Sequence, residues 1–217
     1  MNARAFLLSL ISFIFFSFSP PMSSAQTLIN FDDISTSYIS SGKVIEATLA
    51  PVTNGYQGLC WNNFGVVNVP LQTSLYATNG YTYGMVSPPN VAFNSGGTPA
   101  EIDLPGGSFN FLSVYLTGAW NSNLNIEVQG FNGANLLYDE TVVASATNST
   151  LFVFNYLDID CLTFNSSGGQ NAGFPLGQGE EFAMDNLSIE FVPEPSTVLL
   201  TALGALALYA LLKRKRA

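Results

Sequence analysis

Three aspartates stand where runs with strand-like alternation begin or end. Asp32 and Asp33 follow the first apolar run of the central region, and Asp185 comes directly before the alternating run 186–191. Ca²⁺ takes about six to eight oxygen ligands from carboxylates, amides and carbonyls. Because the region offers these acids almost no Lys or Arg, the sequence predicts a structural calcium site at Asp32, Asp33 and Asp185. The alternative is that these carboxylates cap turns by accepting backbone N–H groups.

A second candidate site combines aromatic rings with side-chain amides. Tyr56 and Trp61 lie in a Gly- and Asn-rich segment, and Asn62 and Asn63 follow Trp61 directly. A planar ring with polar neighbours is the combination that a sugar-binding surface needs. The segment is therefore a candidate glycan-binding loop. The alternative is that the rings fill the core of a β-sandwich, which is the usual place of aromatic side chains.

Two cysteines, Cys60 and Cys161, lie about 100 residues apart. An even number permits a disulfide in an oxidising compartment, worth roughly 4–5 kcal/mol for a loop of this length. The alternative is two buried free thiols on neighbouring strands, because sequence spacing does not determine the distance between Cα atoms.

Catalysis is disfavoured by the residue types that are missing. The chain has no histidine, which excludes a Ser-His-Asp triad and a Cys-His pair. A glycoside hydrolase needs two carboxylates, and Glu101 and Asp103 would share a face of one strand. One such pair is expected by chance in an acidic chain. We therefore predict a protein that is not an enzyme, with a polysaccharide-acting enzyme as the alternative.

Charge is distributed very unevenly along the chain. Residues 26–192 contain 14 Asp and Glu but one cation, Lys43, which gives a formal charge of −13. Nucleic-acid binding depends on Lys and Arg contacting phosphates. The sequence therefore predicts no nucleic-acid partner.

The pattern of residues 26–192 is that of β-structure. Runs 124–129 and 186–191 alternate apolar and polar residues, runs 109–116 and 151–154 read as buried strands, and Asn132-Gly133 is a hairpin signal. We expect one all-β domain, an antiparallel β-sandwich, preferably a jelly roll. In outline it resembles carbohydrate-binding jelly rolls, in which the first and last strands are neighbours and a structural calcium often bridges them.

Three segments of this region resemble stretches of uncharacterised secreted proteins from bacteria and fungi. They are residues 55–64, 87–96 and 109–120, the last with the spacing Phe-x-Phe-x-Ser-x-Tyr-x-Thr-x-x-Trp. The resemblance implies a secreted β-sandwich domain and no particular activity.

Residues 1–25 have the layout of a secretory signal peptide. Arg4 precedes an apolar run over 5–18, and small residues precede an expected cleavage site after Ala25. The alternative is an uncleaved N-terminal anchor helix, although the run is shorter than the roughly 20 residues that a membrane span needs.

The C-terminal segment 193–217 has three parts. Pro193, Glu194 and Pro195 come first, an uncharged run over 197–212 follows, and residues 213–217 form a basic tail. The run predicts a transmembrane helix of roughly 24 Å, held with its basic end in the cytoplasm. The segment resembles the PEP-CTERM sorting signal of exported bacterial proteins. The alternative is a plain single-pass anchor.

This resemblance implies a partner and a route. An exosortase, a membrane protease, recognises the Pro-Glu-Pro motif while the tail holds the protein in the inner membrane, and the body is then released to the cell surface or extracellular matrix. The sequence therefore predicts a non-catalytic exported protein, structural or weakly glycan-binding, with exopolysaccharide as a candidate partner.

Overall fold

The computed structural model describes residues 25–175, 177–193 and 195–214. Residues 26–194 form one compact unit, and helix α4 (Pro195–Arg214) belongs to the other. The unit of residues 26–194 contains its own hydrophobic core, so it is expected to fold without the two ends of the chain. The predicted signal peptide falls almost entirely outside the described residues and stays a prediction.

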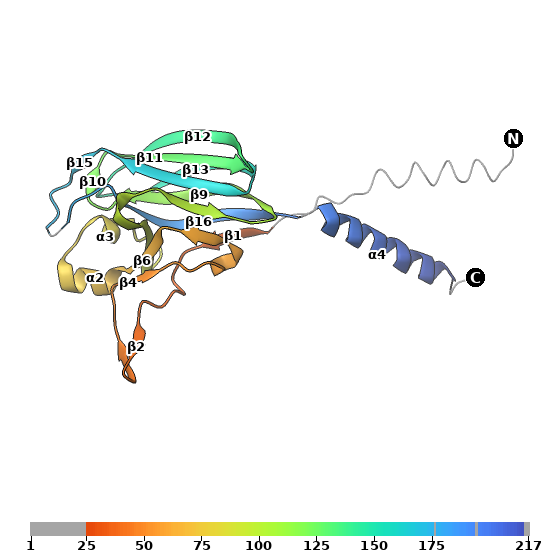
Figure 1. The fold of residues 1–217 in the computed structure, drawn as a ribbon, viewed down its shortest axis with the longest axis horizontal. Coiled ribbons are helices and arrows are strands. Elements are labelled where there is room, and N and C mark those ends of the chain that lie inside the picture. Colours follow the sequence, from red (N-terminus) through yellow and green to blue (C-terminus); the bar gives the residue numbers. More distant parts are fainter. Residues whose placement is uncertain (1–24, 176, 194, 215–217) are drawn as a thin grey trace. The chain divides into compact units, whose positions relative to one another are not determined.

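Two antiparallel sheets pack into a β-sandwich (Figure 1). The seven-stranded sheet has the order β13-β9-β16-β7-β6-β4, with β1 also paired to β16, and the five-stranded sheet has the order β12-β11-β14-β8-β5. The strands of the larger sheet are β1 (Gln26–Ile29), β4 (Leu49–Pro51), β6 (Phe64–Asn68), β7 (Asn90–Asn94), β9 (Ser108–Gly118), β13 (Thr150–Ile159) and β16 (Phe182–Val192). Those of the smaller sheet are β5 (Cys60–Asn62), β8 (Ala100–Asp103), β11 (Leu124–Asn132), β12 (Asn135–Ala144) and β14 (Cys161–Ser167). The prediction of an all-β antiparallel sandwich is confirmed.

The first and last strands are neighbours, as expected for the jelly-roll form. Strand β1 pairs with β16 from Gln26 opposite Glu190 to Ile29 opposite Leu187. Strand β7 pairs with the other half of the same edge of β16, through Ala183 and Met184. One long strand therefore joins the N-terminal segment to the middle of the sheet.

The core lies between the two sheets and follows the predicted alternation. Leu124, Ile126 and Val128 point inward from β11, and Leu187 and Ile189 point inward from β16. Burial of each such aliphatic side chain contributes roughly 1.5–3 kcal/mol, which is why a one-residue slip in register would be costly. Figure 1 shows β11 and β12 in the layer over β9 and β16.

One predicted buried strand is only half buried. Leu151 and Val153 of β13 are exposed, whereas Phe154 belongs to the core. Strand β13 lies at the edge of the seven-stranded sheet, and its alternate residues Leu151 and Val153 point to the outer face, which is exposed along this strand. The apolar run alone did not reveal this edge position.

Two short helices were not predicted from the sequence. Helix α2 (Val69–Tyr76) begins where the Asn68 side chain accepts the Leu71 N–H at 3.1 Å, and α3 (Gly80–Gly84) begins where Asn79 accepts the Tyr81 N–H. Gly80 packs so closely on Gly118 of β9 that no side chain fits there. These are tertiary requirements, since neither helix is long enough to form alone.

A hairpin leaves the sandwich between β1 and β4. Its strands β2 (Tyr38–Ser40) and β3 (Lys43–Ile45) pair with each other in a separate two-stranded sheet. Figure 1 shows the hairpin projecting from the body of the domain.

The remaining elements are short. Strands β10 (Asn121–Ser122) and β15 (Gln170–Asn171) pair with each other, and single 3₁₀ turns lie at Tyr56–Gly58 and Ser95–Gly97.

Helix α4 includes the predicted helix 197–212 and carries Lys213 and Arg214 in its last turn. Among the described residues, no helix is both long enough and apolar enough to cross a membrane. The membrane span predicted at 197–212 stays a prediction.

Candidate functional site

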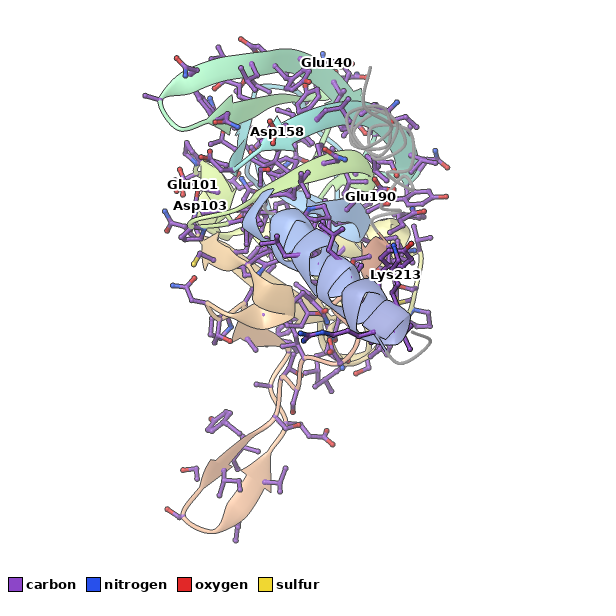
Figure 2. All side chains as sticks on the ribbon, turned by 90° about the vertical axis from the view of Figure 1, so that its right-hand side faces the viewer. Glu101, Asp103, Glu140, Asp158, Glu190 and Lys213 are labelled. Atoms are coloured by element: carbon purple, nitrogen blue, oxygen red, sulfur yellow. The ribbon has the colours of Figure 1, made fainter. Side chains whose placement is uncertain are left out.

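Glu101, Asp103 and Cys161 meet on the outer face of the five-stranded sheet. Strand β8 buries Ala100 and Ile102 and therefore turns Glu101 and Asp103 outward. Cys161 lies opposite Asp103 on β14. One carboxylate oxygen of each acid and the cysteine Sγ all lie within 4.8 Å of one another. Figure 2 shows the two acids side by side at the surface.

The charges of this group interact strongly. The hydrogen bond with Asp103 raises the pKa of Glu101, and partial burial and the negative charge of Asp103 act in the same direction. These effects favour the protonated form of Glu101. Burial raises the pKa of the Cys161 thiol, and its hydrogen bond and charge interaction with Asp103 raise it further. Cys161 is consequently a poor nucleophile, because the reactive species is the thiolate.

The same three side chains could hold a cation. Within the part of the chain that the structure describes, they are the one group of three Asp, Glu or Cys ligands gathered this closely. Two carboxylates and a thiol suit Zn²⁺ better than Ca²⁺, which needs more oxygen ligands than this group offers. Sequence reasoning had placed Glu101 and Asp103 on one face but had not brought Cys161 to them.

The disulfide prediction was wrong. Cys60 and Cys161 are both free. Their strands β5 and β14 flank β8 on opposite sides, and in the strand register both cysteines lie opposite Asp103. Two strand spacings separate them by roughly 10 Å, beyond the roughly 7 Å that a disulfide can bridge. The alternative of two free thiols is correct, but the thiols are half-buried rather than buried. Their strands β5 and β14 are not neighbours, because β8 lies between them.

Asp185 is a buried carboxylate with a full set of donors. One oxygen accepts the N–H groups of Val86 and Ser87, both at 2.7 Å, and the other accepts the Asn186 N–H at 2.7 Å and the Ser87 hydroxyl at 3.1 Å. Its exposed fraction is 0%. Burial raises the pKa of Asp185 to about 6, although these hydrogen bonds act in the opposite direction.

The structure does not gather the three predicted calcium ligands. Asp32 accepts the Asn90 N–H at 3.1 Å, and Asp33 accepts the Tyr56 hydroxyl at 2.7 Å, while Asp185 is used by the 86–87 segment. The three carboxylates do not form a group within 4.8 Å. The hydrogen bonds support the turn-capping alternative at Asp32 and Asp185.

Trp61 does not form a surface platform. It points inward from β5 with 5% of its surface exposed and contacts the rings of Phe31 and Phe64 edge to face. Its indole N–H donates to the Tyr56 carbonyl at 3.0 Å. The prediction that Trp61 leads a glycan-binding loop was therefore wrong, since strand alternation places this ring in the core.

The neighbours of Trp61 have separate roles. Tyr56 is half-buried and packs against the core, with its hydroxyl on Asp33. The Asn63 side chain donates to the carbonyl oxygens of Ser95, Thr98 and Pro99, so it holds the 95–99 loop. Of the four predicted glycan ligands, Asn62 is exposed on the outer face of the five-stranded sheet.

A polar row crosses all five strands of the smaller sheet on this outer face. The register places its members directly opposite one another, in the order Asn62, Glu101, Thr163, Gln129 and Asp139. Five strands span about 19 Å. Gln129 donates to Asp139 at 3.2 Å. The sequence shows the alternation within each strand, but the strand order that aligns these residues is a property of the tertiary structure.

The C-terminal segment after β16 carries the sorting motif. Strand β16 ends at Val192, Pro193 follows, and α4 begins at Pro195, while Glu194 lies outside the described residues. A PEP-CTERM protein-sorting motif matches residues 191–215. The chain carries a PEP-CTERM tail. It is therefore an exported protein with a C-terminal sorting signal for an exosortase.

Solved structures show the fold of the domain. A DUF4465 family protein from Bacteroides caccae superposes with a TM-score of 0.50 at 10% identity, covering 77% of this chain and 100% of that one. A DUF4465 family protein from Bacteroides ovatus gives 0.43 at 14% identity, covering 79% and 96%. TmCBM61 in complex with β-1,4-galactotriose gives 0.33 at 10% identity, covering 65% and 94%. The first similarity shows a shared β-sandwich fold, and the other two scores are too low to carry an argument.

The comparison with curated proteins gives no match. The activity of the domain that the PEP-CTERM tail delivers must therefore be argued from its own surface.

Proposed function

We propose that this is a non-catalytic protein of the cell surface or exopolysaccharide matrix whose domain binds neutral polysaccharide weakly through the polar row. The observation that carries the proposal is the alignment of amide, carboxyl and hydroxyl groups across five strands. Phe131 lies on the same face, opposite Cys161, and is only half-buried. Hydrogen-bonding groups beside an aromatic ring are what sugar hydroxyls and ring faces require.

The negative charge on the outer face of the five-stranded sheet favours neutral over anionic polysaccharides as ligands. Glu101, Asp103, Glu127 and Asp139 all project from it, and residues 26–192 contain one cation to offset them. An anionic polysaccharide would be repelled. Neutral chains are therefore the proposed ligands.

The geometry of the acids supports a non-catalytic role. A glycoside hydrolase holds its carboxyl groups about 5–9.5 Å apart on either side of the scissile bond. Glu101 and Asp103 are instead hydrogen-bonded to each other, with carboxyl oxygens within 4.8 Å. A sugar bond would not fit between them.

Binding of the isolated domain to glycans tests this proposal. Residues 26–193 are titrated by calorimetry with neutral and acidic polysaccharides, including the exopolysaccharide of the host. We expect dissociation constants of roughly 0.1–1 mM for neutral chains. Asn62→Ala with Gln129→Ala should weaken binding about tenfold, because each substitution removes a hydrogen-bonding amide of the polar row, exposed at Asn62 and half-buried at Gln129.

The control is a matched double variant outside the five-stranded sheet. Asn148→Ala with Gln170→Ala removes two exposed amides and should leave the affinity unchanged. Absence of binding at millimolar sugar would refute the glycan proposal and leave a structural role. Hydrolysis of a glycan that disappears in Glu101→Gln would instead support the enzyme alternative.

Localisation follows from the PEP-CTERM tail. We propose that the tail anchors the protein in the inner membrane until the exosortase acts, after which the domain reaches the cell surface or matrix. Replacing Pro193, Glu194 and Pro195 by alanine should leave unprocessed protein in the inner-membrane fraction. Normal release of this variant would contradict the sorting role of the motif.

A further inference from the structure

The hairpin β2–β3 exposes apolar side chains on both of its faces. Its register pairs Tyr38 with Ile45 and Ile39 with Val44, so the two pairs point to opposite sides. Ile39 is 78% exposed and Val44 is 70% exposed. A lone two-stranded hairpin is marginally stable in water. This one is therefore expected to gain stability from contact with another surface.

The hairpin also has open backbone edges. Among the described strands, β2 and β3 pair with no strand other than each other. Their outward N–H and C=O groups can add to the edge of another sheet, which is a common mode of strand recognition.

Strand β12 is a matching edge. It is ten residues long and lies at the end of the five-stranded sheet, with β11 as its partner. Leu136, Leu137 and Val143 are exposed along it, and Glu140 is exposed between them. A long, exposed, partly apolar edge strand is where further pairing is expected.

The two elements are complementary in charge. Lys43 is exposed beside the turn of the hairpin and is the one cation of residues 26–192. Glu140 gives β12 a negative group with no other lysine or arginine in the domain to meet it. Because every copy of the domain is strongly acidic, this lysine is placed where it can reduce repulsion at a contact between copies.

One molecule cannot make this contact with itself. Figure 1 shows the hairpin and β12 at opposite ends of the domain, and Figure 2 shows the same for the hairpin and Glu140. A contact between unlike surfaces of identical chains does not close on itself unless a rotation closes a ring.

We propose that the partner of the hairpin is a second copy of this chain, and that β2–β3 of one copy adds to the β12 edge of the next. Ile39 and Val44 pack on the apolar residues of β12, and Lys43 pairs with Glu140. Repetition of this head-to-tail contact links delivered domains into chains outside the cell. The inference does not depend on glycan binding.

Sedimentation velocity of residues 26–193 tests the proposal. From about 1 µM to about 1 mM protein, at about 0.15 M salt to screen the repulsion between copies, we expect the mean mass to rise above that of a monomer. Ile39→Asn with Val44→Asn and Lys43→Glu should each weaken association about tenfold or more, because they remove central apolar or charged contacts.

A charge exchange makes the test specific. Glu140→Lys should weaken association like Lys43→Glu, and the two substitutions combined should restore it. Glu190→Lys, a charge reversal on β16, and Val153→Asn, an exposed valine on β13, are matched controls expected to keep the original association.

Each remaining outcome overturns the proposal. A monomer at every concentration excludes the second copy as partner, and association that survives the hairpin variants excludes the hairpin. Failure of the charge exchange excludes β12 as the acceptor. Loss of polysaccharide binding in Ile39→Asn with Val44→Asn, while the protein stays monomeric, would assign the hairpin to glycan instead. The separate variants Asn62→Ala and Gln129→Ala distinguish this result from failure of the polar row.

Discussion

Asp185 and the Glu101–Asp103 pair are two carboxyl sites of the same sandwich with opposite arrangements. Asp185 is fully buried and accepts four hydrogen bonds, three of them from backbone N–H groups. Glu101 and Asp103 lie on the outer face and interact with each other and with Cys161. Both sites raise the pKa of a carboxyl group, one mainly through burial and the other mainly through a neighbouring acid.

The difference separates a structural acid from an available one. The lone pairs of Asp185 are occupied by the 86–87 segment, so it can offer little to a ligand. The outer pair is only half-buried and is positioned by a strand whose alternate residues are in the core. Both sites contain a carboxyl group with a raised pKa, which by itself is a mark of a candidate functional site. The hydrogen-bond donors that surround Asp185, and not the outer pair, distinguish the two sites.

The largest expected effect is the loss of the Asp185 carboxylate. Asp185→Ala leaves the Val86 and Ser87 N–H groups without their acceptor in a buried place, which should lower the free energy of unfolding by about 3–5 kcal/mol. Chemical denaturation measures it. Asp33→Ala, at an exposed aspartate, is the control and should cost less than about 1 kcal/mol. A small effect of Asp185→Ala would remove the distinction between the two sites.

The second test is the pH dependence of stability. The pKa of Asp185 is raised from its ordinary value of 3.8 to about 6 in the folded state. The unfolded chain therefore loses this proton first as pH rises, so stability is highest near pH 4 and falls through pH 6. The fall should be about 2 kcal/mol, or roughly 4–8 °C in Tm.

Asp185→Asn is the check on this assignment. It should flatten the slope between pH 4 and 6 even if it lowers Tm throughout, because the titrating group is gone. An unchanged slope would mean that other acids, such as Glu181, whose pKa burial also raises, cause the decline.

The third test probes the outer pair through the reactivity of Cys161. Because its thiol pKa is raised, alkylation at pH 8 should be at least about tenfold slower than that of a free cysteine. Asp103→Asn removes the negative charge and hydrogen bond beside the thiol and should speed alkylation several-fold. Intact-mass spectrometry with peptide mapping measures the rate and should also find no disulfide without reductant. Equal rates in both proteins would show that Asp103 does not control the thiol.

The smallest expected effect is that of Glu101→Gln. The glutamine amide can donate a hydrogen bond to Asp103 in place of the Glu101 carboxyl group, so the free energy of unfolding should change by less than about 0.5 kcal/mol. Asp103→Leu, which removes the acceptor and adds an apolar side chain, serves as the contrasting variant. A loss above about 2 kcal/mol in Glu101→Gln would make this pair as structural as Asp185.

Local patterns were sufficient for much of the fold. Alternation in 124–129 and 186–191 predicted strands that β11 and β16 confirm, and Asn132-Gly133 predicted the turn between β11 and β12. Helices α2 and α3 were missed because both are short, and α3 depends on the close packing of Gly80 against Gly118 of β9. The edge position of β13 was missed because an apolar run does not show which strands lie beside it.

The candidate site was only partly accessible from the sequence. Glu101 and Asp103 were expected on one face because strand residues two apart always share a face. The order of the strands places Cys161 and Gln129 on that face, which the sequence does not show. Trp61 lies in the core because alternate residues of β5 point inward.

By itself, the sequence determined the acidic charge, the lack of histidine, the β-sandwich class and the PEP-CTERM tail, because these depend on composition or on contiguous residues. The tertiary structure alone decided that Cys60 and Cys161 lie on either side of Asp103, that Asp185 is used internally, and that a polar row crosses five strands. These features require residues far apart in the chain to become neighbours, and pairing between strands, rather than any local preference, sets which ones meet.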